Sequence, residues 1–153
     1  MDKTLDPFVV LVADDDEDDC FLLEAAFQEM GKRYDLRFVD DGRDLLDYLY
    51  HKGNFADPVR YPRPDLILLD LNMPRIDGRS ALRIIKADQR LSTIPILILT
   101  TSKEQQDIEL TKKAGASSFL AKPNGYDALK KMLEEFCTAI LHDPNIPFQV
   151  VGC

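Results

Sequence analysis

The chain has 153 residues, of which 45% are hydrophobic and 30% are charged, as is typical of one compact globular domain. Its net charge of −8 argues against general nucleic-acid binding and against adhesion to anionic membranes, because both need a basic surface. No apolar stretch approaches the roughly 20 residues of a membrane span, and no signal peptide is evident, so we expect a cytoplasmic protein. Three widely separated cysteines favour free thiols, although Cys153 could form an intermolecular disulfide in air.

Short apolar runs alternate along the chain with stretches of helical periodicity. The runs predict buried strands, because several of them are apolar at every position, as are strands covered on both faces. They are FVVLV at 8–12, LRFV at 36–39, LILL at 66–69, IPILIL at 94–99 and SFLA at 118–121. Helices are predicted between and after them, at 17–30, 43–51, 79–88, 103–114 and 126–141. The stretch 103–114 is largely polar, so we expect this helix to be exposed.

Five consecutive strand–helix units predict an α/β fold. We expect a doubly wound parallel sheet of five strands, (βα)5, with helices on both faces. Residues 1–7 are expected to form a short lead and residues 8–141 the domain. The extension at 142–153 is either an extended arm or disordered, and the proline-rich stretch 51–64 predicts a long loop before the third strand.

Polar and charged residues follow four of the predicted strands. In an open α/β sheet the functional crevice lies at the carboxyl ends of the strands, so these residues are expected to gather at one edge. They are Asp14, Asp15 and Asp16 after the first strand, Asp70 after the third, Thr100, Thr101 and Ser102 after the fourth, and Lys122 after the fifth. If these strands are neighbours, the edge collects carboxylates, hydroxyls and one ammonium group.

This set of groups suits a hard divalent cation together with a phosphoryl group. Mg²⁺ prefers carboxylate and carbonyl oxygens and leaves positions for water and phosphate oxygens. A lysine neutralises a phosphate as a point charge, and an aspartate can accept a phosphoryl group as an acyl phosphate. The cation would also relieve the repulsion within the acidic stretch VADDDEDDC at 12–20.

Together these residues resemble a bacterial two-component response regulator, a stand-alone receiver domain of the CheY-like superfamily. The resemblance runs from about Val9 to about Ile140. It rests on the acidic pair after the first strand, on LLDLNMPRIDG at 68–78, on the threonine after the fourth strand and on Lys-Pro after the fifth. It implies that residues 8–141 are a receiver domain with a flavodoxin-like sheet of strand order 2-1-3-4-5.

The resemblance assigns a phosphoacceptor and a metal site. It implies that Asp70 accepts the phosphoryl group and also ligates Mg²⁺, that Asp15 is a direct ligand and that Asp14 lies beside it. Asn72 is expected to offer its backbone carbonyl to the metal. A plainer interpretation of Asp14 and Asp15 is a solvated helix start, and Asp16 is better explained as the N-cap of the first helix than as a ligand.

Further residues match the positions that bind the phosphoryl group and respond to it. The resemblance implies that Thr100 hydrogen-bonds the phosphoryl group, that Lys122 pairs with it and that Phe119 is a switch aromatic. It also implies a cis peptide bond between Lys122 and Pro123. Thr100 could instead simply fill a strand end, and Phe119 could be ordinary core. Asp19 is interpreted as a first-turn acid favoured by the helix dipole.

Other features narrow the resemblance to a subgroup. Thr101 is bulkier than the Ala or Gly often found there, and Asn124 replaces the usual apolar residue after Lys-Pro. LTTS at 99–102, the long loop and the extension resemble stand-alone regulators paired with cyanobacterial and bacterial phytochrome kinases. We therefore expect a sensor histidine kinase of the phytochrome type as partner. A homodimer is expected through the helix 4–strand 5–helix 5 face or the C-terminal arm, without direct DNA binding and without membrane contact.

The implied function is a phosphorylation switch for protein–protein signalling, in which Asp70 is phosphorylated from a kinase phosphohistidine and the domain catalyses only its own phosphorylation and dephosphorylation. One alternative is a phosphorelay shuttle that passes the phosphoryl group to a histidine phosphotransfer protein. An aspartyl-phosphate phosphohydrolase is disfavoured because Asn72 stands where its acid/base aspartate should be. An EF-hand fits Asp14, Asp16 and Asp18, but the loop lacks the glycine and the glutamate that Ca²⁺ binding needs.

Overall fold

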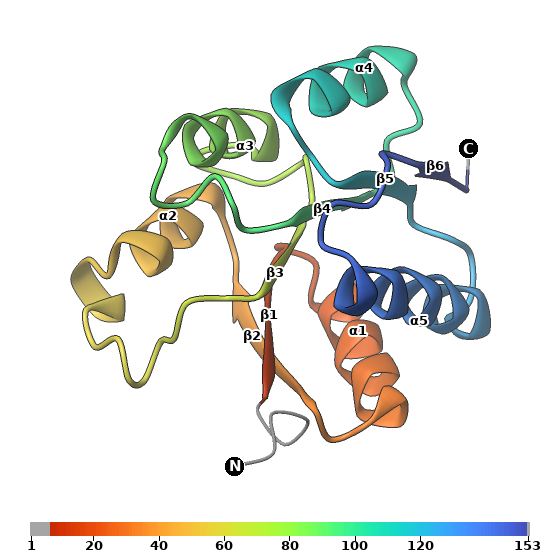
Figure 1. The fold of residues 1–153 in the computed structure, drawn as a ribbon, viewed down its shortest axis with the longest axis horizontal. Coiled ribbons are helices and arrows are strands. Elements are labelled where there is room, and N and C mark those ends of the chain that lie inside the picture. The colour runs from red at the N-terminus through yellow and green to blue at the C-terminus, as the bar shows by residue number, and fades with distance from the viewer. Residues whose placement is uncertain (1–6, 153) are drawn as a thin grey trace.

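The computed structural model describes residues 7–152. In chain order the elements are β1 (Phe8–Ala13), α1 (Glu17–Met30), β2 (Tyr34–Val39), α2 (Gly42–Tyr50), the 3-10 turn η2 (Gly53–Phe55), β3 (Leu66–Leu69), α3 (Gly78–Ala87), β4 (Ile96–Thr100), α4 (Gln105–Ala114), β5 (Ser118–Ala121), α5 (Tyr126–His142) and β6 (Val150–Val151). One parallel sheet has the order β2-β1-β3-β4-β5-β6 (Figure 1). The predicted fold and strand order are confirmed, and β6 is an additional strand.

Within residues 7–152, no helix combines the length and apolar character needed to cross a membrane.

Single residues set several element boundaries. β4 begins at Ile96 rather than at position 94, because Pro95 has no N–H to donate to the strand ladder. α1 begins directly after Asp16, whose side chain accepts hydrogen bonds from the N–H groups of Asp18 and Asp19. Asp16 is therefore the N-cap of this helix, as one of the two interpretations of the sequence predicted.

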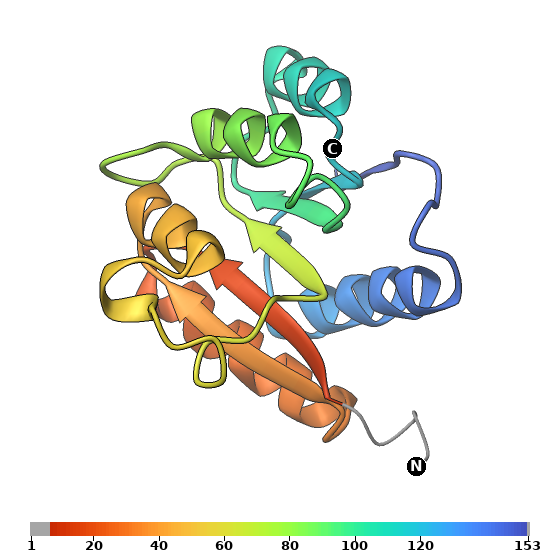
Figure 2. The same cartoon turned by 60° about the vertical axis from the view of Figure 1, so that its left-hand side comes forward.

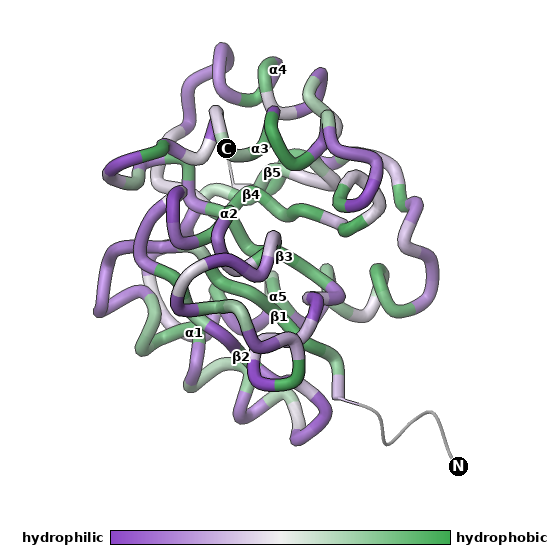
Figure 3. The backbone as a smooth tube through the Cα atoms, turned by 90° about the vertical axis from the view of Figure 1, so that its left-hand side faces the viewer, coloured by the Kyte–Doolittle hydropathy of each residue, from purple (hydrophilic) through white to green (hydrophobic). Residues whose placement is uncertain are grey.

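The core lies on both faces of the sheet, because successive strand residues point to opposite sides. In β1, Leu11 packs in a cluster with Leu45 and Leu82, whereas Val10 packs with Phe27. Accordingly, α2, α3 and α4 cover one face and α1 and α5 cover the other (Figure 2). The central strands are hydrophobic and the outer surfaces of the helices and loops carry most of the hydrophilic residues (Figure 3). This burial holds the strand ends, and hence the site, in a fixed arrangement.

The segment after α5 forms an arm that runs along the edge of the sheet. β6 pairs in parallel with β5, and the N–H of Phe119 donates to the carbonyl of Gln149 at 2.9 Å. The N–H of Gln149 in turn donates to the Ser118 hydroxyl at 3.2 Å. Phe148 packs against the core, with the Lys112 ammonium 5.9 Å from the centre of its ring. The arm therefore covers the edge that β5 would otherwise expose.

α4 differs from its neighbours in what it buries. Its buried residues are Asp107 and Thr111, both polar, whereas α3 buries Ala81, Leu82 and Ile85. The predicted polar character of this helix is correct, but the expectation that it is simply exposed is wrong at these two positions. A helix with so little apolar burial must be positioned largely by polar contacts.

The two cysteines within the described part of the chain, Cys20 and Cys137, are free. Burial raises the pKa of both thiols to about 12. They are therefore protonated at neutral pH and poorly reactive. The predicted intermolecular disulfide of Cys153 lies outside the described residues, as do residues 1–6 of the predicted lead.

Candidate functional site

The carboxyl ends of β1, β3, β4 and β5 lie side by side in the sheet. Asp14 follows β1, Asp70 follows β3, Thr100 ends β4 and Lys122 follows β5. Backbone hydrogen bonds continue past the strand ends, from Asp70 N–H to the Ala13 carbonyl at 3.0 Å and from Lys122 N–H to the Thr100 carbonyl at 2.7 Å. The sheet thus brings together side chains that are as many as 108 positions apart in the chain.

The ammonium group of Lys122 lies among three carboxylates. Its Nζ atom is 2.8 Å from Asp14 Oδ2, 2.6 Å from Asp19 Oδ2 and 3.0 Å from Asp70 Oδ2. Burial alone disfavours the charged lysine, but the hydrogen bonds to Asp14 and Asp19 and the charge of Asp70 outweigh burial and raise the pKa of Lys122. Lys122 is therefore a permanent positive charge at the centre of an acidic edge.

Three carboxylates at this edge form a set of oxygen ligands. Asp14, Asp15 and Asp70 each offer one oxygen, and these oxygens lie within 4.8 Å of one another. Asp14 and Asp70 are buried and Asp15 is exposed, so one side of the set is open to solvent. Burial raises the pKa of Asp14, against the lowering effect of Lys122. Hard oxygens with an open side fit Mg²⁺, which keeps water or phosphate oxygens as its other ligands.

Both oxygens of the Asp70 carboxylate accept hydrogen bonds. Oδ1 accepts from the Thr100 hydroxyl at 3.0 Å and from the N–H of Asn72 at 3.1 Å. Oδ2 accepts from Lys122 at 3.0 Å. These donors orient the carboxylate, and a phosphoryl group attached to it would lie next to a hydroxyl and an ammonium group.

The loop after β3 approaches α3 unusually closely. Gly78 is the first residue of α3, and a Cβ atom at this position would lie 2.2 Å from the carbonyl oxygen of Asp70. The N–H of Gly78 donates to the Leu71 carbonyl at 3.0 Å. A glycine is needed here because the backbone passes directly beside Asp70 and leaves no room for a side chain.

Asp19 is a member of this edge that sequence reasoning missed. The sequence indicates only an ordinary acid in the first turn of α1, yet the Asp19 carboxylate makes the shortest of the three contacts with Lys122. The signal was weak, because Asp19 is one of several consecutive acids and only the packing of α1 determines which of them faces the site. The N-cap at Asp16 sets that helical phase.

The resemblance implies that Phe119 in β5 is a switch aromatic and that the bond between Lys122 and Pro123 is cis. Phe119 is completely buried in the cluster under α2, α3 and α4. The bond between Lys122 and Pro123 is trans, as are the other peptide bonds between described residues, so the expected cis bond is wrong. Trans is the ground state of X–Pro bonds by about 0.5–1 kcal/mol, and Lys122 reaches the carboxylates in this form.

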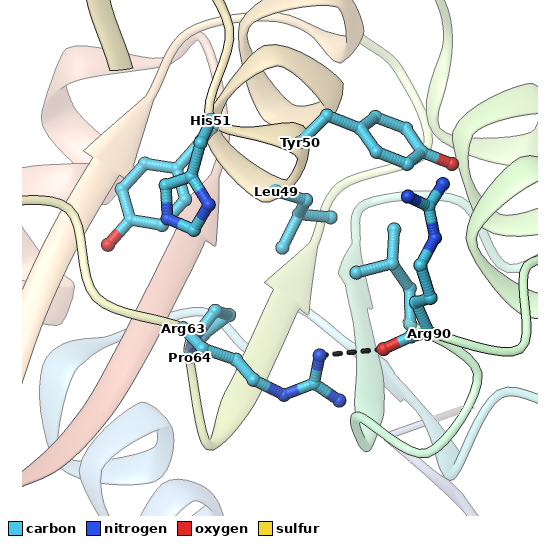
Figure 4. Close-up of a pocket in the computed structure, with 8 residues that line it drawn as sticks. Leu49, Tyr50, His51, Arg63, Pro64 and Arg90 are labelled. Carbon is cyan, nitrogen blue, oxygen red and sulfur yellow. Dashed lines mark hydrogen bonds between the residues drawn. The ribbon is translucent and has the colours of Figure 1, made fainter. Parts of the chain in front are cut away.

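A separate cavity of about 260 Å³ lies near the amino-terminal ends of β3 and β4, at the opposite end of these strands from the candidate site (Figure 4). Its walls come from the end of α2 and from the loops that precede β3 and β4, so it is remote from the carboxyl ends of these strands. Arg63 spans part of it and donates to the carbonyl of Arg90 at 2.6 Å (Figure 4). None of the candidate site residues lines this cavity.

Comparisons with known proteins agree with this geometry. The pattern of the response regulator receiver domain matches residues 10–134. The probable methanogenesis regulatory protein FilR2 of Methanothrix harundinacea is 34% identical over 131 residues, covering 85% of this chain and 81% of that protein. Response regulator Rcp1 of Synechocystis sp. is 32% identical over 146 residues, covering 95% of this chain and 97% of Rcp1.

Solved structures show the same similarity in three dimensions. The Mn²⁺-bound form of Rcp1 superposes with a TM-score of 0.81 and 30% identity, covering 92% of this chain and 99% of that one. The phosphorylated cyanobacterial phytochrome response regulator RcpA gives a TM-score of 0.81 at 28% identity, covering 90% and 96%. Receiver domains are phosphorylated proteins of two-component signalling and have no enzymatic role beyond their own phosphorylation. This chain belongs to the response regulator receiver domain family.

Proposed function

We propose that Asp70 accepts a phosphoryl group from a phosphohistidine of a sensor histidine kinase, and that the chain thereby switches its conformation for protein–protein signalling. The placement of the Asp70 carboxylate between Thr100 and Lys122 carries this proposal. In the transfer, an oxygen of Asp70 forms a bond to phosphorus. The bond between phosphorus and the imidazole nitrogen breaks, and that nitrogen keeps the bonding electrons.

The surrounding residues would bind and orient the transferred group. Asp14, Asp15 and Asp70 would hold Mg²⁺, together with the backbone carbonyl of Asn72, and the bound ion would supply positive charge that offsets the charge on the phosphoryl oxygens. Lys122 is already within hydrogen-bonding distance of Asp70 and would pair with one of these oxygens. The Thr100 hydroxyl, which now donates to Asp70 Oδ1, would donate to the phosphoryl group instead.

Switching requires that the phosphorylated state favour a second arrangement. We propose that Thr100 moves toward the phosphoryl group, that Phe119 rearranges with it and that the surface of α4, β5 and α5 changes. Shifting a balance from 1:99 to 99:1 needs about 5.5 kcal/mol of differential stabilisation. New charge-assisted hydrogen bonds from Lys122 and Thr100 to the phosphoryl oxygens would supply much of this energy.

The proposed partner is a kinase of the phytochrome type. RcpA, which resembles this chain over nearly its whole length, is a cyanobacterial phytochrome response regulator. Another similar structure is that of a bacteriophytochrome response regulator, AtBRR. A shuttle that passes the phosphoryl group on to a histidine phosphotransfer protein is the alternative, and it would use the same Asp70 chemistry.

The direct test is the intact mass of the protein after incubation with Mg²⁺ and a small acyl-phosphate donor. We expect the mass to increase by one phosphoryl group, and no increase in a sample with excess chelator. The Asp15→Asn variant should need a higher Mg²⁺ concentration to react, because it removes an exposed ligand and leaves the buried residues in place. Failure of the wild type to gain mass from both the small donor and a phosphorylated histidine kinase would refute the proposal.

We also propose a homodimer formed through the α4–β5–α5 face or through the C-terminal arm. Val150 and Val151 in the arm remain 43% and 36% exposed as residues although their backbone is paired, so they can contact a second molecule. We expect phosphorylated full-length protein to sediment as a dimer and a chain that ends at Leu141 to sediment as a monomer. Monomers in both proteins, with and without phosphorylation, would contradict this.

A further inference from the structure

An ion pair next to the site joins the first turns of α3 and α4. Arg79, the second residue of α3, donates from Nε to Asp107 Oδ1 at 2.6 Å and from Nη2 to Asp107 Oδ2 at 2.7 Å. Both oxygens of a buried carboxylate are thus bound by one guanidinium, the strongest geometry for such a pair. The hydrogen bond from Arg79 lowers the pKa of Asp107, so the pair is charged at neutral pH.

The same carboxylate is connected to the residues that bind Asp70. The Ser102 hydroxyl donates to Asp107 Oδ2 at 2.7 Å, and the N–H of Ser102 lies 3.3 Å from the Thr100 hydroxyl oxygen. That hydroxyl in turn donates to Asp70 Oδ1 at 3.0 Å. A continuous series of hydrogen bonds therefore runs from the phosphoacceptor to α4.

These polar contacts matter because α4 has little other attachment. Its only two buried residues within the described chain are Asp107 and Thr111, and Ile108 and Ala114 are only partly buried against the core. Apolar burial therefore constrains the position of α4 less than that of α3 or α5. The position of α4 depends strongly on where Asp107 is held.

We propose that Arg79, Asp107 and Ser102 form a latch that holds α4 in its resting position and that opens when Thr100 turns to a phosphoryl group on Asp70. This inference rests on the proposed function. When Thr100, the last residue of β4, moves, Ser102 moves with it, because Ser102 lies two residues further along and its N–H is bonded to the Thr100 hydroxyl; the Ser102 hydroxyl then leaves Asp107. Arg79 and Asp107 are then positioning residues: they do not touch the phosphoryl group, but they set the balance between the two states.

The latch has a measurable consequence for binding at Asp70. A contact that stabilises only the resting state opposes every ligand that favours the other state, and by linkage its removal tightens binding of that ligand. We expect Arg79→Gln and Asp107→Asn each to tighten binding of beryllofluoride, a phosphoryl mimic, by roughly fivefold or more in the presence of Mg²⁺. Fluorine NMR titration measures the bound mimic directly.

A second arginine–aspartate pair, in the loop between α3 and β4, serves as a matched control for the Arg79 variants. Arg90 binds both oxygens of Asp88, through Nε at 3.2 Å and Nη2 at 2.8 Å, and within residues 7–152 no series of hydrogen bonds connects this pair to Asp70. Arg90→Gln should leave the beryllofluoride affinity unchanged. Arg79→Lys keeps the charge but not the two-point geometry, and it serves as a milder variant if Arg79→Gln does not fold.

The possible results separate the latch from the proposed function. If the wild type binds beryllofluoride and the Arg79 and Asp107 variants bind it more tightly, the latch is supported. Variants that lose thermal stability but bind beryllofluoride as tightly as the wild type, or more weakly, would show a purely structural ion pair and overturn the inference. Absence of binding by the wild type itself, at millimolar Mg²⁺, would overturn the proposed function, and the latch with it.

Discussion

Asp70→Asn is expected to abolish phosphoryl incorporation under conditions in which the wild type gains one group. The amide has nearly the shape of the carboxylate: its single oxygen can still accept the hydrogen bond from Lys122, and its NH2 group can donate to the Thr100 hydroxyl oxygen. It lacks the anionic oxygen that attacks phosphorus, so the reaction itself is lost while the fold is kept. The variant also removes one negative charge from a cluster with Asp14 and Asp15, so the metal-free protein should not lose stability.

The matched control for this variant is Asp40→Asn. Asp40 follows β2 at the same edge of the sheet, but it is exposed and is not part of the ligand set. The control should gain mass as the wild type does. Continued incorporation by Asp70→Asn at the wild-type rate would mean that another residue is the phosphoacceptor.

Lys122→Met is expected to lower the free energy of unfolding of the metal-free protein by about 3 kcal/mol, the lower end of values for breaking a buried ion pair. The substitution keeps most of the side-chain volume but leaves the buried carboxylates of Asp14 and Asp70 without their cation. Mg²⁺ should restore part of the loss in this variant, because it supplies charge to the same carboxylates. Denaturant unfolding with and without Mg²⁺ measures both effects.

The pH dependence of this contribution has a defined sign. The pKa of Lys122 is raised in the folded protein, so its stabilisation is complete below the ordinary value of 10.5 and is lost only as the pH rises above it. The difference between the wild type and Lys122→Met should therefore be constant between pH 7 and pH 9. Lys130→Met, which removes the half-buried partner of the exposed Glu29, is the control and should cost little. Equal losses in the two variants would contradict the central role of Lys122.

Much of the fold could be predicted because its strands are covered on both faces. β3 and β5 have the predicted bounds, since LILL and SFLA are buried at every position. β6 could not be predicted as a strand of this sheet, because its two residues are exposed and it exists only through pairing with β5. Local sequence carries no signal for such a pairing.

The residues of the site that lie at strand ends could be predicted from the sequence, whereas those whose contacts depend on helix packing could not. Asp70, Thr100 and Lys122 meet because each follows or ends a strand, which the apolar runs made visible. The contact of Asp19 with Lys122 depends on how α1 packs. The ion pair of Arg79 and Asp107 depends on how α3 and α4 pack, and its two residues are 28 positions apart. Periodicity identifies a helix face but not the side chain that it meets.

The measurement that tests the central claim most directly is to locate the phosphoryl group. Borohydride reduces an acyl phosphate, and the aspartate that carried it becomes homoserine, which peptide mass spectrometry identifies by position. The account predicts homoserine at position 70 in protein treated with Mg²⁺ and an acyl-phosphate donor, and aspartate at position 70 in the chelated sample. Homoserine at Asp14 or Asp15, or a gain of mass with no homoserine at position 70, would contradict it.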